Sequence, residues 1–446
     1  MKEKEIKERL LEKFGITELN NIQTAMLQAS SEKRDIVLLS PTGTGKTIAF
    51  VMPVLKKLKE ADGRIQCLVV VPTRELVIQI GEVFRALAAN YKVTLLYGGH
   101  KVEDEVNSLK VTPEIVVSTP GRLVDHINRR NVNLLTVRIL VLDEYDKCIE
   151  LGFEDDLKKI MAKLKNVSRI ILTSATRPKE LPEFLKLKDP VELDFTQANS
   201  DVADRTTVYR VESVDEGHDK LRSLGLLLTE LAKGKPSIPR TIIFVNHRES
   251  AERVYGYLKK EGIDAVLYHG ALNQRDREMA VARFNNGSSP ILVATDLAAR
   301  GLDIKGVENV VHYHQALTPE VYTHRNGRTS RVNEEGNVYI LVSPGEKLKD
   351  FGKIDREFKL TDGEVARLRS GLLTFYVNAG KKEKVSKGDI LGFLTKEVGI
   401  PGSEIGKIDV YDHYSIFCVA SKEKERILEA QRSKKLKGER RKISLL

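Results

Sequence analysis

Short apolar runs alternate with amphipathic stretches along two long segments of the chain. Each run has the length of a strand that is buried on both faces, and the stretches between the runs have the spacing of helices with one apolar side. In the first segment the predicted strands are 35–40, 67–72, 93–98, 114–119, 138–143 and 169–174. In the second segment they are 241–246, 265–270, 290–295, 310–314 and 338–343. This alternation predicts two α/β units, each a parallel sheet covered by helices.

A different pattern follows the second segment. After Ser343 the composition becomes that of a charged helix, and from Leu372 a third unit begins, which we predict to be a small α+β sheet domain. The polar stretch 196–205 is the expected hinge between the two α/β units. The predicted elements of the third unit are a strand at 373–380, a helix at 387–399, a strand pair at 405–420 and a basic helix at 422–437.

The charge of the chain is concentrated near its C-terminus. The 446 residues carry a net charge of +10, and residues 381–446 hold 16 Lys and Arg against 10 Asp and Glu. A basic surplus of this kind suits a polyanionic partner, although a solvated basic helix gives the same composition.

Cysteine usage and hydropathy restrict the cellular setting. Cys67, Cys148 and Cys418 are too far apart for a metal-ligand motif, which argues against a zinc site or a disulfide framework and favours a reducing compartment. The start of the chain, MKEKEIKERL, lacks the apolar core of a secretory signal, and no run of about 18 apolar residues occurs. We therefore expect a soluble cytoplasmic protein that does not act at a membrane.

The sequence SPTGTGKT stands where a predicted strand ends and a helix begins. The amide N–H groups of such a loop and the N-terminus of the following helix can surround phosphate groups, and glycines permit the close approach. Lys46 is the expected partner of the β and γ phosphates, and Thr47 of Mg²⁺. Ser40 departs from the strict pattern, which has glycine there, and an ordinary glycine-rich turn is the alternative. The predicted nucleotide loop is Ser40, Pro41, Thr42, Gly43, Thr44, Gly45, Lys46 and Thr47.

The sequence DEYD at 143–146 ends another predicted strand of the same sheet. The carboxyl edge of such a sheet is where ligands bind, so a phosphate loop gives these acids a task. We expect Asp143 to hold Mg²⁺ through water and Glu144 to orient or deprotonate the attacking water. Without the loop, acids that are merely solvated at a strand end would be the better interpretation.

The sequence THRNGRTSR at 323–331 gathers three arginines and a histidine in the second unit. Phosphoryl transfer needs cations near the charge that develops on the γ-phosphate, and arginine is suited to this. Arg328 and Arg331 are the candidates, and a solvated basic helix face is the alternative.

The ordered set of motifs resembles the DEAD-box ATP-dependent RNA helicases over roughly residues 5–345. The resemblance implies two tandem RecA-like parallel-sheet domains, at 1–200 and 206–356, with ATP and Mg²⁺ as cofactors and RNA as partner. The matching motifs are SPTGTGKT (40–47), PTREL (72–76), GG (98–99), TPGR (119–122), DEYD (143–146), SAT (174–176), IFVN (243–246), HGALNQRDR (269–277), ATDLAARGLDI (294–304) and HRNGRTSR (324–331).

The same resemblance implies roles for further residues. Gln23 would recognise adenine and Asp303 would contact the ATP ribose. Coupling of hydrolysis to strand separation falls to Asp146, Ser174, Thr176 and His324. Contacts to the RNA backbone fall to Thr73, Arg74, Gly99, Thr119, Gly121 and Arg122 in the first unit and to Gln274, Arg277 and Thr295 in the second. Hydroxyls, glycine amides and arginines of this kind grip phosphate and sugar rather than base edges.

Several positions depart from the family pattern. Leu19–Asn20 stands where Pro and Thr are usual in the adenine motif, so adenine specificity could be looser. In the arginine motif Asn326 and Ser330 replace the usual Ile and Gly, and upstream His314 replaces an Asp. Tyr145 occupies a position that varies in the wider helicase group, and we interpret it as a packing residue beside the site.

Residues 372–446 resemble the RNA-recognition-like domain at the end of DbpA-type helicases, at 380–400, 405–420 and 436–446. In that group the domain tethers the core to ribosomal RNA of the large subunit, so large-subunit ribosomal RNA and pre-ribosomal particles are the implied partners of a monomeric chain. Lys381 and Lys382 are the expected phosphate contacts. Four strand aromatics, which either stack on bases or belong to the core, are Tyr376, Tyr411, Tyr414 and Phe417.

The sequence thus predicts an ATP-dependent RNA helicase that remodels structured RNA by RNA-stimulated ATP hydrolysis and local duplex separation, acting in assembly of the large ribosomal subunit. Two alternatives stay open. One is a general helicase acting on messenger RNA or cold-stabilised duplexes, and the other is an RNA-binding scaffold with a weakened ATP site.

Overall fold

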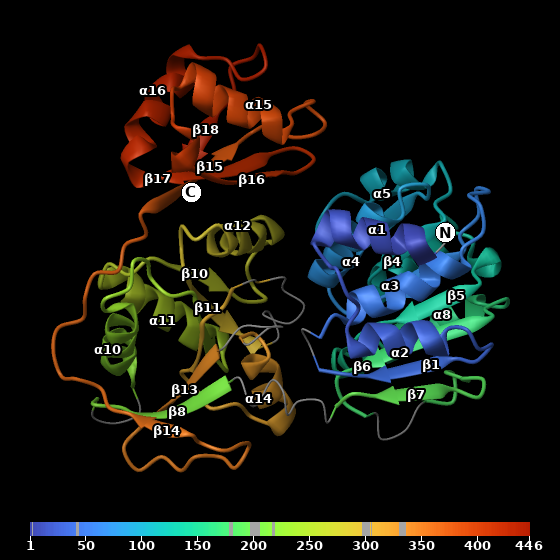
Figure 1. Cartoon of the computed structure of the whole chain (residues 1–446), viewed down its shortest axis with the longest axis horizontal. Helices are drawn as coiled ribbons and strands as arrows, with labels where there is room; N and C mark the ends of the chain where they lie inside the picture. Colours follow the sequence, from blue (N-terminus) through green and yellow to red (C-terminus); the bar gives the residue numbers. More distant parts are fainter. Residues whose placement is uncertain are drawn as a thin grey trace. The chain divides into compact units, whose positions relative to one another are not determined.

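The computed structural model describes residues 1, 3–41, 44–177, 182–196, 206–215, 219–296, 304, 306–329 and 336–446. The chain divides into two compact units. One contains the first α/β segment, which we call the first lobe. The other contains the second α/β segment, called the second lobe, together with a small C-terminal domain (Figure 1).

The first lobe is a seven-stranded parallel sheet with the strand order β3-β4-β2-β5-β6-β1-β7. Its strands are β1 (Ile36–Leu39), β2 (Cys67–Val70), β3 (Val93–Leu96), β4 (Ile115–Ser118), β5 (Ile139–Leu142), β6 (Arg169–Ser174) and β7 (Val191–Asp194). Its helices are α1 (Glu3–Phe14), α2 (Asn21–Ala29), α3 (Lys46–Lys57), α4 (Arg74–Leu87), α5 (Val102–Leu109), α6 (Pro120–Asn128), α7 (Tyr145–Glu150) and α8 (Glu154–Lys163).

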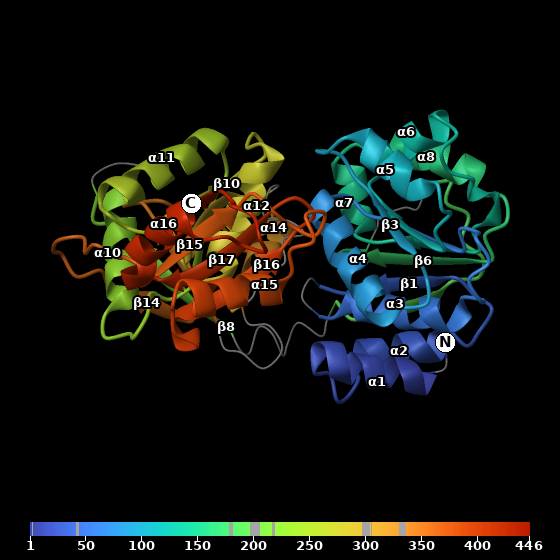
Figure 2. The same cartoon turned by 90° about the horizontal axis from the view of Figure 1, so that it is seen from above.

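Both faces of this sheet are buried, which explains the continuous apolar runs. In β1, Ile36 and Leu38 join a core with α1 to α4, whereas Val37 and Leu39 join a core with α6 to α8. Figure 2 shows the two helical layers, with α3 on one side of β6 and α6 and α8 on the other. Successive side chains of a strand point to opposite faces, so four apolar residues in a row fill both cores.

The second lobe repeats the topology of the first. Its strand order is β10-β11-β9-β12-β13-β8-β14, and all pairs are parallel. Counted from its own first strand, this order is the same as in the first lobe. The strands are β8 (Thr206–Glu212), β9 (Thr241–Val245), β10 (Ala265–Tyr268), β11 (Ile291–Thr295), β12 (Asn309–His312), β13 (Gly336–Val342) and β14 (Arg356–Phe358). The helices are α10 (Leu221–Ala232), α11 (Arg248–Lys260), α12 (Gln274–Asn285) and α14 (Pro319–Asn326).

The C-terminal domain is a four-stranded antiparallel sheet with the order β16-β17-β15-β18. Its core lies between one sheet face and the helices, and Phe375 stacks on Phe417 there with ring centroids 5.4 Å apart. The elements are β15 (Leu372–Val377), α15 (Lys387–Gly392), β16 (Ile405–Val410), β17 (Ser415–Ala420), α16 (Lys424–Ser433) and β18 (Ile443–Leu445).

The fold class expected from the sequence is confirmed, and every strand predicted in the two α/β segments is present. Four strands were missed, namely β7, β8, β14 and β18. The charged helix expected after Ser343 is wrong, because 344–371 contains only the short strand β14. In the helix predicted at 387–399, α15 passes at Phe393 into a π-helical turn that ends at Glu397. No helix among the described residues is long and apolar enough to cross a membrane.

Candidate functional site

The carboxyl edge of the first sheet divides into two halves. The loop that contains Lys46 follows β1, the SAT sequence ends β6, and DEYD follows β5, and these strands are neighbours in the order β5-β6-β1. The predicted RNA contacts follow β2, β3 and β4, which are neighbours at the other end of the sheet. The strand order therefore brings each set of motifs together and separates the two sets.

The phosphate loop is held by contacts within itself. Lys46 is buried, and its Nζ donates to the backbone oxygen of Ser40 at 2.6 Å. The hydroxyls of Ser40 and Thr44 are 2.7 Å apart. Thr47 stands in the first turn of α3, and Pro41 precedes the loop residues Thr42 and Gly43, which lie outside the described residues.

Gly45 is required by the packing of this loop. It adopts φ 88°, and a Cβ at this position would lie 2.8 Å from Nε2 of Gln23. Gln23 in turn forms a capping box with Asn20. The backbone N–H of Gln23 donates to Asn20 Oδ1 at 3.0 Å, and the side-chain Oε1 of Gln23 accepts from the backbone N–H of Asn20 at 3.1 Å. Asn20 Nδ2 also donates to the Thr44 oxygen at 3.0 Å. The unusual Asn20 thus links the predicted adenine residue to the phosphate loop.

Asp143 and Glu144 are both buried, with exposed fractions of 3% and 8%. Burial raises the pKa of Asp143, and the opposing charge of Lys46 only partly compensates. The Thr173 hydroxyl donates to Asp143 and accepts from the Glu144 N–H at 3.2 Å, so one threonine positions both acids. Glu144 has φ 49°, a left-handed conformation that is costly for a non-glycine residue and is found at functional sites.

The predicted coupling residues of the first lobe contact one another. Thr176 Oγ1 donates to Asp146 Oδ2 at 3.4 Å, and Ser174 Oγ donates to the Thr176 oxygen at 2.6 Å. The other carboxylate oxygen of Asp146 is buried and has no hydrogen-bond partner among the residues described.

Tyr145 points away from these groups and into the core between the sheet and α8. Its side chain is 2% exposed and packs with residues such as Leu157 and Ile160. Burial raises the pKa of Tyr145 to about 12, and its hydroxyl has no partner within the described ranges. The ring is therefore a packing element, as we expected from the sequence.

The predicted RNA residues of the first lobe surround two helix N-termini. Thr73 caps α4 by accepting from the Leu76 N–H at 3.3 Å, and Thr119 precedes α6, which begins at Pro120. Gly99 has φ 101°, a conformation suited to glycine. Arg74 and Gly121 each have a close neighbour. A Cβ added to Gly98 would lie 3.2 Å from the Arg74 guanidinium, and a Cβ added to Gly121 would lie 3.5 Å from the Asp156 carboxylate.

Arg122 is oriented by a buried carboxylate that the sequence did not reveal. Its Nε lies 2.9 Å from Glu105, which is 3% exposed and also accepts from His126 Nε2 at 2.7 Å. Burial acts to raise the pKa of Glu105, but hydrogen bonds from His100 and His126 outweigh it and lower the pKa to about 2. Glu105 precedes TPGR by many residues, so only the adjacency of β3 and β4 could identify this pair.

The predicted RNA residues of the second lobe lie at β11 and α12. Thr295 ends β11, while Gln274 and Arg277 stand in the first turns of α12. Arg277 donates to the backbone oxygens of Leu272 at 3.0 Å and Gly270 at 3.1 Å, so the preceding loop positions its guanidinium.

The arginine motif contains a residue whose role sequence reasoning missed. His324 and Arg328 are buried, whereas Arg331 and Asp303 lie outside the described residues. Arg325 is only 1% exposed and forms a fork on Asp296, with distances of 2.5 and 2.7 Å.

Arg325 also joins two neighbouring strands. It donates to Asn246 Oδ1 at 2.7 Å and to the His314 oxygen at 2.6 Å. The partners Asn246 and Asp296 belong to the motifs IFVN and ATD, at the ends of β9 and β11. Predicting their contacts with Arg325 from the sequence would have required knowing that these two strands are neighbours.

The departures in this lobe have partners of their own. His312 Nε2 lies 2.8 Å from Asn326 Oδ1, and its Nδ1 accepts from Arg325 at 3.3 Å, so the ring is neutral and donates to Asn326. Burial lowers the pKa of His312 to about 3, and the Arg325 charge adds to the effect. His314 Nδ1 accepts from the Asn246 N–H at 3.3 Å, and burial lowers its pKa to about 4.

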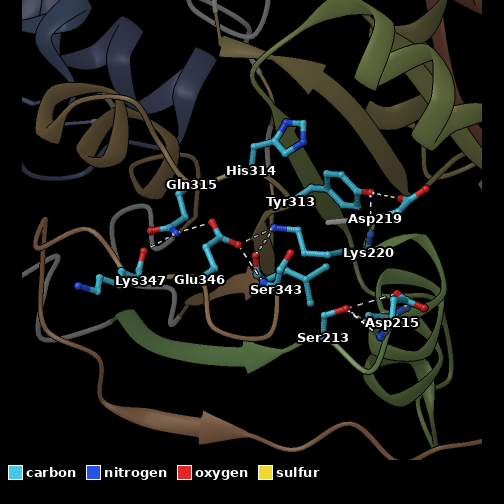
Figure 3. A network of polar contacts seen from close by, with 12 residues as sticks. Ser213, Asp215, Asp219, Lys220, Tyr313, His314, Gln315, Ser343, Glu346 and Lys347 are labelled. Atoms are coloured by element: carbon cyan, nitrogen blue, oxygen red, sulfur yellow. Dashed lines mark hydrogen bonds and ion pairs between the residues drawn. The ribbon is translucent and has the colours of Figure 1, made fainter. Parts of the chain in front are cut away.

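A lysine in the second lobe, Lys220, lies close to the place that Lys46 has in the first. Lys46 is the first residue of α3, directly after the loop that follows β1, and Lys220 is the N-cap residue of α10, directly after the loop that follows β8. Its Nζ donates to the Leu341 oxygen at 2.7 Å and lies 3.4 Å from the Glu346 carboxylate (Figure 3). Burial lowers the pKa of Lys220.

The basic loop of the C-terminal domain is anchored on the turn between β16 and β17. Lys381 and Lys382 are exposed, and their amide N–H groups donate to the oxygens of Tyr411 and Asp412, each at 2.8 Å. Gly380 precedes them, and a Cβ there would meet the Tyr411 oxygen at 2.2 Å, so only glycine allows this approach. The two lysines are therefore presented to solvent by a fixed backbone.

Phe417 does not serve as a base-stacking residue, since it is fully buried in the core of the C-terminal domain. Three tyrosines lie on the other face of the sheet, with ring centroids 4.5 Å apart for Tyr411 and Tyr414 and 5.6 Å for Tyr376 and Tyr414. The strand alternation explains both outcomes, because Tyr376 and Phe375 are consecutive and point to opposite faces.

Comparison with known proteins agrees with this arrangement of sites. Residues 20–184 match the DEAD/DEAH box helicase family, 220–333 match the helicase conserved C-terminal domain, and 374–445 match the DbpA RNA binding domain. The chain is 33% identical over 450 residues to the ATP-dependent RNA helicase DbpA of Escherichia coli strain K12, covering 98% of this chain and 96% of that one. The chain belongs to the DEAD-box RNA helicases.

Other members of the family support the assignment. The helicase is 31% identical to the DEAD-box ATP-dependent RNA helicase RhpA of Helicobacter pylori, over 88% of this chain and 83% of the relative. Its structure resembles that of S. cerevisiae Dbp5 bound to RNA and ADP BeF3, with a TM-score of 0.69 and 25% identity over 80% of this chain and 93% of that one. The protein is thus an ATP-dependent RNA helicase, an RNA-dependent ATPase, with a DbpA RNA-binding domain.

Proposed function

We propose that this helicase remodels structured ribosomal RNA during assembly of the large ribosomal subunit. The observation that carries the proposal is the DbpA RNA-binding domain at 374–445, on a chain that matches E. coli DbpA along nearly its whole length. The exposed lysines Lys381 and Lys382 supply a surface for RNA phosphates. Pre-ribosomal particles would then be the assemblies on which a monomeric chain acts, in the cytoplasm.

The first lobe supplies the groups that ATP needs. Lys46 lies in a strand-loop-helix turn and would exchange its contact with the Ser40 oxygen for the β and γ phosphates. Gln23 and Gly45 pack the adenine motif directly against this loop.

The same lobe fits a magnesium ion. Asp143 is a buried carboxylate with a raised pKa, the type of group that a nearby dication would hold in its charged form. Thr47 and Asp143 are its proposed ligands, in part through water. Mg²⁺ bound with ATP would neutralise charge on the γ-phosphate as the bond breaks. Glu144, held in its strained conformation beside Asp143, would orient or deprotonate the attacking water.

RNA binding and ATP hydrolysis are coupled, in this proposal, through a small polar cluster around Asp146. Asp146 keeps one buried carboxylate oxygen without a partner among the described residues. Thr176 donates to the other oxygen, and Ser174 donates to the backbone oxygen of Thr176. We assign these three and His324 to coupling, and Arg328 and Arg331 to the γ-phosphate. The contacts to the RNA backbone are assigned to the residues named from the sequence in each lobe.

The RNA target is tested by crosslinking bound RNA in cells and sequencing it. We expect fragments of large-subunit ribosomal RNA to be enriched over messenger RNA. Lack of enrichment would remove the assembly role and leave the helicase activity, in which case a general helicase becomes the better interpretation.

The basic loop is tested by charge reversal in the full-length protein. The double variant Lys381→Glu with Lys382→Glu should lose preference for structured ribosomal RNA as an ATPase stimulator and keep its rate without RNA. Lys259→Glu with Lys260→Glu, an exposed pair on α11, is the matched control and should keep the preference. Equal loss in both pairs would contradict a role for the loop.

The scaffold alternative predicts no meaningful ATP turnover. Tyr145, one of the departures that motivate this alternative, is packed in the core on the side away from Asp143 and Glu144. Glu144→Gln should therefore reduce RNA-stimulated turnover strongly while ATP still binds. An unchanged low rate in both proteins would favour the scaffold.

A further inference from the structure

Helix α12 carries a second functional face besides the one with the predicted RNA contacts. Arg275, Glu278, Met279 and Ala282 follow the spacing i, i+3, i+4 and i+7, so they form one stripe along the helix. Gln274 lies roughly 90° and Arg277 roughly 150° around the helix from the centre of this stripe, at about 100° per residue. The stripe faces the C-terminal domain, because Met279 and Ala282 are buried against Ile416 of β17.

The surface that receives this stripe is the outer face of the C-terminal sheet. Its inner face packs under α15 and α16, yet Thr374 and Ile416 on the outer face are only 2% and 1% exposed. Tyr376, Tyr411 and Tyr414 pack around the same cluster. Figure 1 shows α12 between β10 and this sheet, and Figure 2 shows the strands overlying the helix from a second direction.

Polar contacts fix the orientation of the two surfaces. The Tyr414 hydroxyl donates to the Glu278 carboxylate, and burial together with this carboxylate raises the pKa of Tyr414. The Arg275 guanidinium lies 4.6 Å from the centroid of the Tyr376 ring, which is cation–π geometry.

A second group of hydrogen bonds lies beyond the end of α12. Thr374 Oγ1 accepts from Asn286 Nδ2 at 2.8 Å and lies 2.6 Å from Ser288 Oγ. Ser370 Oγ donates to the Gly287 oxygen at 2.8 Å. Two fully buried residues, a charged hydrogen bond and a cation–π pair describe a specific interface rather than a loose tether.

We infer that the outer face of the C-terminal sheet is a docking surface for α12 and not a base-stacking surface. RNA bound to the exposed side of the C-terminal domain is then held at a fixed position relative to Gln274 and Arg277, which lie on another side of the same helix. We call this fixed position the register. The statement about the register rests on the proposed RNA contacts, whereas the docking itself does not.

The absence of tryptophan from the chain allows a direct test of the docking. The variant Tyr376→Trp introduces a single tryptophan into the full-length protein. We expect its fluorescence to be poorly quenched by iodide, and to become several-fold more accessible when Met279→Lys is added on the lobe side. Met279 lies in the interface cluster, so the substitution opposes docking without opening the lobe's own core.

A charge-matched control separates docking from a general effect of charge. Glu249→Gln changes the net charge by the same amount as Met279→Lys and lies on the exposed side of α11. It should leave the tryptophan protected. A tryptophan that is already accessible to iodide in the otherwise native chain would overturn the docking.

Adding RNA distinguishes docking from base stacking. The probe is a fluorescently labelled ribosomal RNA hairpin whose binding is followed by its anisotropy. When it binds the Tyr376→Trp variant, the tryptophan emission should stay unchanged. Quenching of that emission on binding would mean that bases stack on this face, and the inference would fail. If no RNA binds at all, the proposed function fails while the iodide result still decides the docking.

The fixed position of bound RNA relative to α12 is tested by ATPase measurements on variants that keep Tyr376. Met279→Lys should raise the RNA concentration that half-saturates ATPase stimulation several-fold and leave the rate without RNA unchanged, whereas Glu249→Gln should change neither. If Met279→Lys exposes the tryptophan but leaves half-saturation unchanged, docking stands and the fixed register is wrong.

Discussion

The two lobes share one topology but use the same position in it differently. In the first lobe, the turn between β1 and α3 is rich in glycine, and Lys46 contacts only a loop oxygen among the hydrogen bonds described for its Nζ. In the second lobe, the turn between β8 and α10 presents Ser213 and Asp215, which hydrogen-bond to each other, and Lys220 is bound to Glu346 (Figure 3).

This difference shows how one strand-turn-helix unit becomes either a ligand site or a structural support. A lysine held by a neutral carbonyl can change partners when phosphate arrives. A lysine in an ion pair with a carboxylate would have to break that pair to bind phosphate, and acids in the turn would repel a phosphate. Fold alone therefore does not assign the nucleotide to one lobe, and the residues in the turn do.

Removal of Lys46 should give the largest effect. Lys46→Gln is expected to lower RNA-stimulated ATP turnover by about 100-fold or more, because it removes the cation that contacts the phosphates. Its melting temperature should stay close to that of the wild type. Phosphate release and thermal unfolding are the measurements, and turnover within a few-fold of wild type would place the phosphate cation elsewhere.

Replacing Arg325 by lysine keeps its positive charge but should still lower the stability of the second lobe. In Arg325→Lys the fork on Asp296 cannot form, and we expect the free energy of unfolding to fall by about 2–3 kcal/mol. Urea unfolding measures this. Arg248→Lys on α11, an exposed arginine, is the control and should change little. Equal stability of the two variants would mean that the hub does not support the lobe.

Lys220→Met sharpens the comparison with Lys46 most directly. The substitution leaves Glu346 without its cation, so we expect unfolding to become easier by about 1–2 kcal/mol. ATP turnover per folded molecule should persist, in contrast to Lys46→Gln. Loss of ATP binding in a variant of normal stability would show that the second lysine also serves the nucleotide.

Acidification should act with opposite sign on the two buried histidines of the second lobe and on the buried Asp143 of the first lobe. His312 and His314 have folded pKa values of about 3 and about 4 against an ordinary 6.5, so the unfolded chain binds more protons. Their contribution to stability is present above pH 6.5 and is lost as pH falls toward 4. The raised pKa of Asp143 acts in the other direction, since its folded form takes up a proton more readily.

The test compares urea unfolding at about pH 7 and about pH 5 in the wild type and in His314→Asn. The variant should lose less stability on acidification than the wild type. A steeper loss in the variant would contradict the assignment of this pH dependence to His314.

The smallest change is expected at Tyr145. Its hydroxyl is buried without a partner among the described residues, so Tyr145→Phe should leave stability unchanged or raise it by about 1 kcal/mol. ATPase activity should stay near that of the wild type. A large loss of activity with normal stability would show that the hydroxyl takes part in the reaction.

The sequence by itself determined the elements that are buried on both sides and the motifs that are local. β1 and β5 are runs of apolar residues because two helical layers cover them, and SPTGTGKT forms its site within eight consecutive residues. The edge strands β7 and β14 escaped prediction because an edge strand needs little burial and carries charged residues.

Tertiary structure alone decided the contacts that join distant segments. Glu105 meets Arg122 because β3 and β4 are adjacent, and Arg325 meets Asp296 because β11 lies beside β9 and near α14. The sequence left open whether the tyrosines of the C-terminal domain stack on bases or belong to a core, and only the tertiary structure packs them at the outer sheet face against α12. A periodic pattern states that a face is apolar, but only packing shows which surface covers it.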